Sequence, residues 1–223
     1  MRRQRPLWNS QRTEGCRSKL TKDSDHTNIL VMNDDNSQQP TSAVEFFDRN
    51  PVFHTEEFHV ACCRSAKRGS RSNLLNYFVR RGRILPIRRG VYAVVPYSRR
   101  VEDFKPNRYL VASALKPDTV LSHHTALEVL GQAHSVSRTL YGFTARSPSD
   151  FAWNDYRFKI LRYPRALNSL KDKNYGVTTR EIEGQTVVVT GPERTLADCL
   201  ASPSYAGGVE EAVVSLRGFP SLF

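Results

Sequence analysis

Residues 78–95 decide the fold of the N-terminal part of this chain, and they read FVRRGRILPIRRGVYAVV. Arg80 and Arg81 stand directly before Gly82, which is typical of a helix end, because cations favour the last turn and glycine adopts the left-handed conformation beyond it. Two short apolar runs follow, one on each side of Arg88-Arg89-Gly90. The stretch therefore predicts the end of a helix followed by a basic β-hairpin.

Three short helices are predicted ahead of this hairpin. The first covers residues 42–49, and the second begins after an N-cap at Thr55. The third covers residues 71–81, after a break at Lys67-Arg68-Gly69 and an N-cap at Ser70. Its apolar side chains fall at helical spacing: Leu74, Leu75, Phe78 and Val79. Three helices followed by a hairpin are the order of a winged helix-turn-helix.

Positive charge is concentrated in the same region. The whole chain has a net charge of +11. Residues 41–100 hold twelve Lys and Arg against four Asp and Glu, a net of +8, whereas residues 1–40 and 101–223 carry only +2 and +1. A basic surface on one small domain suits a polyanion such as DNA, because bound phosphates release condensed counterions. The alternative is an ordinary solvated basic face.

Candidate DNA contacts follow from the docking geometry of helix-turn-helix proteins. The N-terminal residues of the second helix of the motif face base edges, and here these are Ser70, Arg71, Ser72 and Asn73. Arginine can pair with guanine and asparagine with adenine, so Arg71 and Asn73 suit base readout, although both could be solvated first-turn residues. The remaining candidates are basic side chains placed for phosphate or minor-groove contact: Lys67, Arg68, Arg80, Arg81, Arg83, Arg88 and Arg89.

The sequence predicts an α+β protein in three parts. Residues 1–40 hold few apolar side chains and are expected to be disordered, with Met32 as an alternative start of the natural protein. Residues 41–97 form the winged helix-turn-helix, and a polar linker, Pro96 to Pro106, follows it. Residues 107–223 form a mixed α/β domain, whose apolar end without a closing element is consistent with truncation.

Within that second domain, helices and short strands are predicted to alternate. Helices are expected at residues 107–115, 122–130, 192–200 and 208–216. Strands are expected at residues 120–121, 139–145, 157–163, 177–183 and 186–190, the last two forming a hairpin about Glu183-Gly184. In the third of these helices, Arg194 and Asp198 are four residues apart and can form an ion pair, with Leu196, Cys199 and Leu200 facing a core.

No catalytic, metal or cofactor site is predicted. His123 and His124 are adjacent, and a helix cannot aim neighbouring side chains at one metal ion. Neither a phosphate-binding glycine loop nor a hydrolase or zinc-protease motif occurs. Asp150 and Asp155 could serve a metal-dependent nuclease, but no motif collects them, so the sequence favours a protein that is not an enzyme.

The sequence also favours a cytoplasmic protein. It has no run of about 18 apolar residues that could span a membrane, and the polar residues after the basic N-terminus do not form a secretory signal. The four cysteines, Cys16, Cys62, Cys63 and Cys199, lack zinc-ligand spacing. The adjacent pair, Cys62 and Cys63, fits helix residues in a reducing compartment better than a disulfide.

Several of these segments together resemble the AbiEi family, the antitoxin component of type IV (AbiE) toxin–antitoxin systems, which act in phage defence by abortive infection. The resemblance covers residues 42–216. Its motifs, in chain order, are Phe78-Val79-Arg80-Arg81-Gly82-Arg83-Ile84, Arg88-Arg89-Gly90-Val91-Tyr92, Leu115-Lys116-Pro117-Asp118, Ser122, Thr125-Ala126-Leu127, Gly131 and Pro192-Glu193-Arg194-Thr195-Leu196-Ala197-Asp198.

The resemblance implies a transcriptional repressor that binds inverted repeats in its own promoter through an N-terminal winged helix. It also implies a C-terminal domain that counteracts a nucleotidyltransferase-like toxin without a stable complex. By position, Arg83, Arg88 and Arg89 become DNA-contact candidates on the wing. Two alternatives remain: a nuclease targeted by the same DNA-binding module, and a defective fragment folded only at its N-terminus.

Overall fold

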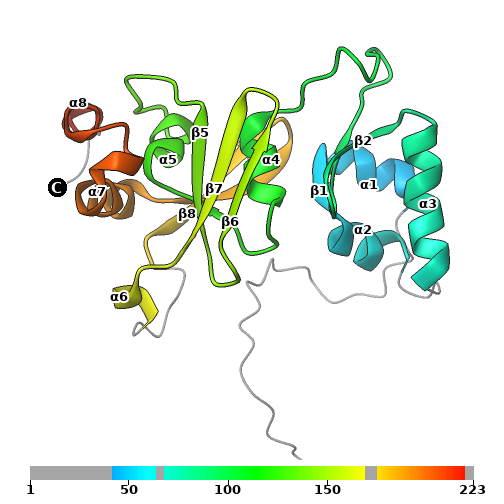
Figure 1. Ribbon diagram of the computed structural model, residues 1–223, viewed down its shortest axis with the longest axis horizontal. Coiled ribbons are helices and arrows are strands. Elements are labelled where there is room, and N and C mark those ends of the chain that lie inside the picture. The colour runs from blue at the N-terminus through cyan, green and yellow to red at the C-terminus, as the bar shows by residue number, and fades with distance from the viewer. Residues whose placement is uncertain (1–41, 64–67, 169–174, 219–223) are drawn as a thin grey trace, which may run out of the picture. The chain divides into compact units, whose positions relative to one another are not determined.

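The computed structural model describes residues 42–63, 68–168 and 175–218. The expected disordered tail, the alternative start at Met32 and the candidate contact Lys67 lie outside the described residues. Figure 1 shows two groups of elements along the chain, the first ending with strand β3 and the second beginning with helix α4. The described structure mixes helices with two sheets and is therefore α+β, as the sequence predicts.

The first group contains helices packed on a small antiparallel sheet. Its elements are α1 (Ala43–Arg49), β1 (Val52–His54), α2 (Thr55–Cys62), α3 (Arg68–Arg80), β2 (Ile84–Arg88) and β3 (Val91–Val94). The sheet has the order β1-β3-β2. One face of it and the three helices enclose a core rich in phenylalanine, in which Phe47 stacks on both Phe53 and Phe58.

The ends of these elements follow from local chemistry. Ser42 caps α1 by accepting a hydrogen bond from the backbone N–H of Glu45 at 3.2 Å. The N-cap of α2 is His54 and not the expected Thr55, because the imidazole Nδ1 accepts from Glu56 N while Glu57 accepts from the backbone of His54. Because of this capping box, α2 begins at Thr55, one residue earlier than it would if the Thr55 hydroxyl were the cap.

Helix α3 begins earlier than the sequence predicts. It starts at Arg68 and not at residue 71, so Ser70 lies inside the helix and is not its N-cap. The expected break rested on Gly69, but a glycine costs a helix only about 1 kcal/mol relative to alanine. Packing of the apolar face of α3, including the buried Leu75, offsets that cost. The predicted helix end at Gly82 is confirmed by its φ of +65°.

The second group is built on a six-stranded sheet in the order β6-β7-β5-β4-β9-β8. Its strands are β4 (Val120–Leu121), β5 (Thr139–Thr144), β6 (Ser149–Trp153), β7 (Tyr156–Arg162), β8 (Val177–Ile182) and β9 (Gln185–Thr190). The pairs β5–β7 and β4–β9 are parallel and the others antiparallel. The predicted turn of the β8–β9 hairpin is confirmed, since Glu183 and Gly184 both have positive φ.

Helices complete this group on both sides of the sheet region. They are α4 (Arg108–Ala114), α5 (His123–Val129), α6 (Arg165–Asn168), α7 (Pro192–Ala201), the 3₁₀ helix η1 (Pro203–Tyr205) and α8 (Val209–Arg217). Four of them, α4, α5, α7 and α8, match predicted helices, whereas α6, η1 and strand β6 were not expected. In α7 the predicted burial of Cys199 is confirmed, but Leu200 is 54% exposed.

Helix α4 contacts both sheets, with neighbours in β1 and β3 of the first and in β4, β5 and β9 of the second. Leu110, Val111 and Ala112 of α4 are fully buried in one core, to which the first sheet contributes Val52 and Val91. The segment after β3 joins that core as well, because Phe104 packs against it. The expected linker therefore runs as turns along the structure and is not an extended spacer.

Candidate nucleic-acid interface

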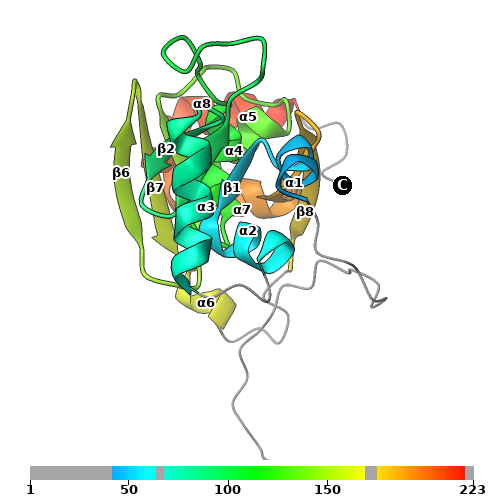
Figure 2. The same ribbon diagram turned by 90° about the vertical axis from the view of Figure 1, so that its right-hand side faces the viewer.

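One face of α3 is polar and exposed from residue 72, where the description of its side chains begins, to the end of the helix. The exposed residues are Ser72, Asn73, Asn76, Tyr77 and Arg80, followed by Arg81 in the turn. They form two neighbouring rows with a spacing of four, one from Ser72 to Arg80 and one from Asn73 to Arg81, which places them on one stripe of the helix. Leu74, Leu75, Phe78 and Val79 alternate with them and pack into the phenylalanine-rich core. Figure 2 shows α3 crossing the face of the molecule turned to the viewer.

This stripe carries positive charge and no acid. Helix α3 contains three arginines and neither aspartate nor glutamate. Tyr77 is 51% exposed, and the guanidinium of Arg81 lies 5.5 Å from the centroid of its ring. Amide, hydroxyl, aromatic and guanidinium groups thus stand together on a stripe whose charged side chains are all positive.

Arg83 extends the surface from α3 onto the hairpin. Its guanidinium lies 3.3 Å from the ring centroid of Tyr97, and its Nη1 donates to the carbonyl oxygen of Val95 at 2.9 Å. These two contacts hold the side chain in place, and Tyr97 is 79% exposed. A shallow hollow of about 290 Å³ lies between this pair and α3, lined by Val44, Phe47, Tyr77, Phe78, Arg81, Arg83 and Tyr97.

The two arginines at the hairpin, Arg88 at the end of β2 and Arg89 in the turn, have different surroundings. Arg88 is half-buried, donates from Nη1 to the Ser149 hydroxyl at 2.9 Å, and lies 5.0 Å from the ring centroid of Phe151. Both partners belong to β6. Arg89 is exposed. The structure therefore places Arg89 where a phosphate could reach it, whereas Arg88 is engaged by the second sheet.

The structure brings together most of the residues that the sequence singled out on α3. Ser72, Asn73, Arg80 and Arg81 share the exposed stripe, and Arg83 adjoins it. The backbones of Arg68, Ser70 and Arg71 are helical, in the first turn of α3. Sequence reasoning missed Asn76, Tyr77 and Tyr97. The spacing of four from Ser72 to Arg80 could have revealed Asn76, and the same spacing from Asn73 to Arg81 could have revealed Tyr77. The contact of Tyr97 with Arg83 depends on the path of the chain after β3.

Asp150, one of the two acids weighed for a nuclease, has a structural partner. Asp150 accepts two hydrogen bonds from the guanidinium of Arg157, at 2.8 and 2.7 Å, and Arg157 lowers the pKa of this carboxyl. His54 serves as the cap of α2. In the part of the chain that the structure describes, no group of three or more His, Cys, Asp or Glu side chains could hold a metal ion.

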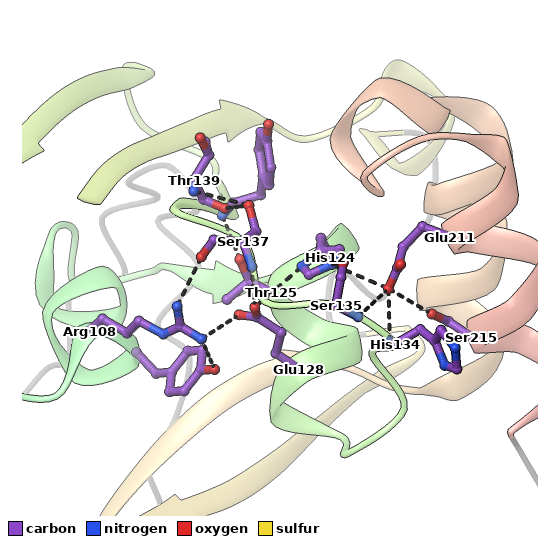
Figure 3. Close-up of polar contacts among 12 residues, drawn as sticks. Arg108, His124, Thr125, Glu128, His134, Ser135, Ser137, Thr139, Glu211 and Ser215 are labelled. Atoms are coloured by element: carbon purple, nitrogen blue, oxygen red, sulfur yellow. Dashed lines mark hydrogen bonds and ion pairs between the residues drawn. The ribbon is translucent and has the colours of Figure 1, made fainter. Parts of the chain in front are cut away.

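His124 belongs to a buried polar network that joins three helices (Figure 3). Its two ring nitrogens lie 3.5 Å from carboxylate oxygens of Glu128 and Glu211, and Glu128 also meets Arg108 at 3.2 Å. Glu211 accepts from the backbone N–H groups of residues 134 and 135 at 2.8 and 3.0 Å. Burial raises the pKa of Glu211, but these hydrogen bonds outweigh it and the pKa is lowered. The network thereby fastens α8 to α5 and α4.

The described cysteines are free thiols: Cys62, Cys63 and Cys199. Burial raises the pKa of Cys62 to about 11 and that of Cys199 to about 12. Both groups therefore stay protonated near neutral pH and are weak nucleophiles. Adjacent Cys62 and Cys63 end α2 without forming a disulfide, as the sequence predicts.

Comparison with known proteins adds no relative to this description. No protein-family model matches the chain, and a search of curated proteins finds no match either. Among the described helices, none is long and apolar enough to cross a membrane.

Proposed function

We propose that residues 42–97 bind double-stranded DNA as a winged helix-turn-helix, with α3 as the recognition helix. The observation that carries the proposal is the exposed stripe of α3, from Ser72 to Arg81, which presents amides, a tyrosine and arginines and no acid. The order of helices followed by an antiparallel hairpin supports it. The concentration of net charge in residues 41–100 supports it too.

The contacts divide by chemistry. Asn73 and Asn76 lie one helical turn apart on the stripe and suit adenine edges in the major groove. Arg80 and Arg81 lie at the C-terminal end of the same stripe and suit phosphates. Arg83, held by Tyr97 and Val95, adds a fixed cation beside them. Base readout therefore belongs to the middle of α3, and backbone contact to its end and to the hairpin.

A salt titration tests this division of roles. The full chain is mixed with fluorescently labelled duplex DNA from the region upstream of its own gene, and with a scrambled duplex. We expect tighter binding to the upstream duplex and an affinity that falls linearly on logarithmic axes as salt rises. Replacing Arg80 and Arg81 by alanine should reduce the slope by up to about two. Replacing the exposed Arg165 of α6 is the matched control and should leave the slope unchanged.

An affinity that does not depend on salt, or equal binding to both duplexes, would refute the proposal. Incubation of the same duplexes with Mg²⁺ or Mn²⁺ tests the alternative of a DNA-targeted nuclease. A site-dependent cut that requires the metal would show that the chain is an enzyme, whereas intact DNA leaves the binding function as proposed.

We further propose that the chain represses its own promoter and acts as an antitoxin in the cytoplasm. This step rests on the resemblance of the chain to AbiEi antitoxins. Co-expression with a nucleotidyltransferase-like protein encoded next to its gene tests the antitoxin role. Growth that is rescued by residues 42–223 supports it, and toxicity that persists despite normal expression of the chain contradicts it.

A further inference from the structure

A second hollow lies in the other group of elements. Its volume is about 380 Å³, within the range of small-molecule sites. It is lined by the first residue of α5, by β5 and the end of β7, and by the junction of α7 with η1. The lining residues used below are His123, Phe143, Arg162, Asp198, Ala201 and Tyr205. None of them belongs to the exposed stripe of α3, so a ligand here would be separate from DNA.

Aromatic rings form much of the wall. The ring centroid of His123 lies 5.1 Å from that of Phe143 and 5.3 Å from that of Tyr205. Two rings outside the lining pack against these walls: the centroid of Tyr163 lies 5.4 Å from that of Phe143, and the centroid of Tyr141 lies 5.1 Å from that of Tyr205. Rings arranged in this way offer flat faces and edges to another planar group.

His123 is an unusual wall residue. It is 3% exposed, and it has a φ of +52° at the first position of α5. Its Nδ1 is 3.0 Å from the hydroxyl of Ser122, while its Nε2 has no hydrogen-bond partner among the described residues. Burial, aided by Arg194, lowers the pKa of His123 to about 4, so the ring is neutral near pH 7. A neutral imidazole can exchange a hydrogen bond with a ligand without carrying charge. Backbone strain of this kind is often found at binding sites.

A buried cation stands behind the wall. The Nε of Arg194 donates to both carboxylate oxygens of Asp198 at 3.1 and 3.0 Å, and its guanidinium lies 5.5 Å from the ring centroid of Phe143. The Nη2 of Arg194 is buried with no hydrogen-bond partner among the described residues. An unpaired buried donor of a charged group is costly in free energy, and the ion pair with Asp198 offsets part of that cost.

Charge in and around the hollow favours a monoanion. Behind the wall, Asp198 forms an ion pair with Arg194. The positive charge of Arg162, at the exposed rim of the hollow, therefore remains. Helices α5 and α7, whose first residues lie about 70 positions apart in the chain, contact each other here and contribute His123 and Asp198 to the lining. The DNA-binding function uses neither of them.

We propose that this hollow binds a small planar aromatic anion, a ring of nucleobase or benzoate size that carries one acidic group. The ring packs against the aromatic wall formed by Phe143, His123 and Tyr205 and shares a hydrogen bond with Nε2 of His123. The acidic group lies at the rim of the hollow, where Arg162 donates charge-assisted hydrogen bonds to it. A nucleoside 5′-monophosphate and an aromatic carboxylate share this chemistry.

Calorimetric titration of the full chain tests the proposal with four probes: adenosine 5′-monophosphate, benzoate, adenosine and inorganic phosphate. We expect at least one of the two aromatic anions to bind at least tenfold more tightly than both adenosine and phosphate, since ring and charge each contribute. The relative affinities of the nucleotide and benzoate identify the source of the acidic group. The proposal is wrong if none of the probes gives a heat of binding at millimolar concentration. It is also wrong if phosphate or adenosine binds as tightly as the aromatic anions.

Two neighbouring residues at the end of α7 provide matched variants. Ala201 lines the hollow and Leu200 does not, and both are exposed. Ala201→Trp should fill the hollow and weaken the binding of the aromatic anion at least tenfold, whereas Leu200→Trp should leave it unchanged. Arg162→Ala should weaken the anion about tenfold and leave adenosine unaffected, because it removes only a charge-assisted contact. Equal affinities in Ala201→Trp and Leu200→Trp would place the ligand elsewhere.

The test is independent of DNA binding. Both tryptophan variants should keep the melting temperature and the DNA affinity of the parent chain, which shows that they fold. If DNA binding fails in every variant and in the parent, the proposed DNA function is wrong while the ligand result still stands. If the parent chain binds DNA but none of the aromatic probes, the ligand proposal is wrong while the DNA-binding function still stands.

Discussion

Arg88 donates a hydrogen bond to the hydroxyl of Ser149 at 2.9 Å, and this bond joins the turn of the first hairpin to the edge strand of the second sheet. The neighbouring Arg89 is exposed. From the sequence, both arginines are equivalent DNA-contact candidates. The contact with Ser149 separates them, since one guanidinium stabilises the protein and the other remains accessible to a phosphate.

Alanine substitutions in the turn should show this difference. Arg89→Ala should weaken binding to every duplex and reduce the salt slope by about one, as expected for one lost phosphate contact. Arg88→Ala should keep the slope and lower the free energy of unfolding by about 1 kcal/mol, because a hydrogen bond within the protein is lost. Fluorescence anisotropy and urea unfolding measure the two effects. A slope that falls equally in both variants would mean that Arg88 leaves Ser149 on DNA.

Asn73 and Arg80 lie on the same stripe of α3 but should have different roles. Asn73→Ala should lose about 1–3 kcal/mol of discrimination at one base pair and keep the salt slope. Arg80→Ala should weaken all sequences alike and lower the slope by about one. Binding to a set of duplexes with single base changes measures both. If Asn73→Ala weakens all duplexes equally, this residue does not read bases and α3 sits in the groove in another orientation.

Local patterns predicted the parts of the fold that depend on near neighbours. The end of α3 at Gly82 and the turn at Glu183-Gly184 follow from glycine, and the ion pair of Arg194 with Asp198 follows from their spacing of four residues. Strand β6 was missed, because it lies at an edge of its sheet with a single partner, and of its apolar residues only Phe151 and Trp153 are half-buried.

The residues that define the two candidate sites depend on distant segments. Arg88 meets Ser149 across 61 residues of chain, and His123 meets Tyr205 across a longer interval. No periodicity in the sequence encodes such contacts. The adjacent histidines illustrate the limit: the sequence predicted that they would not share a metal, but not that His123 would line a hollow while His124 joins a network with Glu211.

The side chain of Gln185 pairs with the backbone of Val52 in β1, as a neighbouring strand would. Its Nε2 donates to the carbonyl oxygen of Val52 at 2.8 Å, and its Oε1 accepts from the backbone N–H of Val52 at 3.2 Å. Val52 is 1% exposed, so both backbone groups would lose their partners in Gln185→Ala. We expect this variant to lose about 1–3 kcal/mol of the free energy of unfolding, measured in urea.

The isosteric variant Gln185→Glu is the comparison for that measurement. A carboxylate keeps an acceptor for the N–H of Val52 but cannot donate to its carbonyl oxygen. Both variants should be less stable than the parent chain. A Gln185→Ala protein as stable as the parent would show that water replaces the amide and that this contact does not hold β1 to the second sheet.

The neutral, buried state of His123 should make the protein less stable in acid. Burial, with Arg194 nearby, lowers the pKa of His123 from 6.5 to about 4. Between these two values the unfolded chain binds a proton that the folded chain does not, so protonation favours unfolding. The contribution to stability is complete above pH 6.5 and falls away as the pH decreases toward 4.

The variant His123→Asn tests this, because asparagine tolerates a positive φ and does not titrate. Unfolding in urea at pH 7, 6, 5 and 4 should show the parent chain losing about 3 kcal/mol more than the variant over this range, from the difference of the two pKa values. His134→Asn is the control, since the side chain of His134 is exposed and the variant should follow the parent. Parallel curves for the parent and His123→Asn would mean that folding does not lower the pKa of His123, and the ring would then gain its proton near pH 6.5 in the folded chain as well.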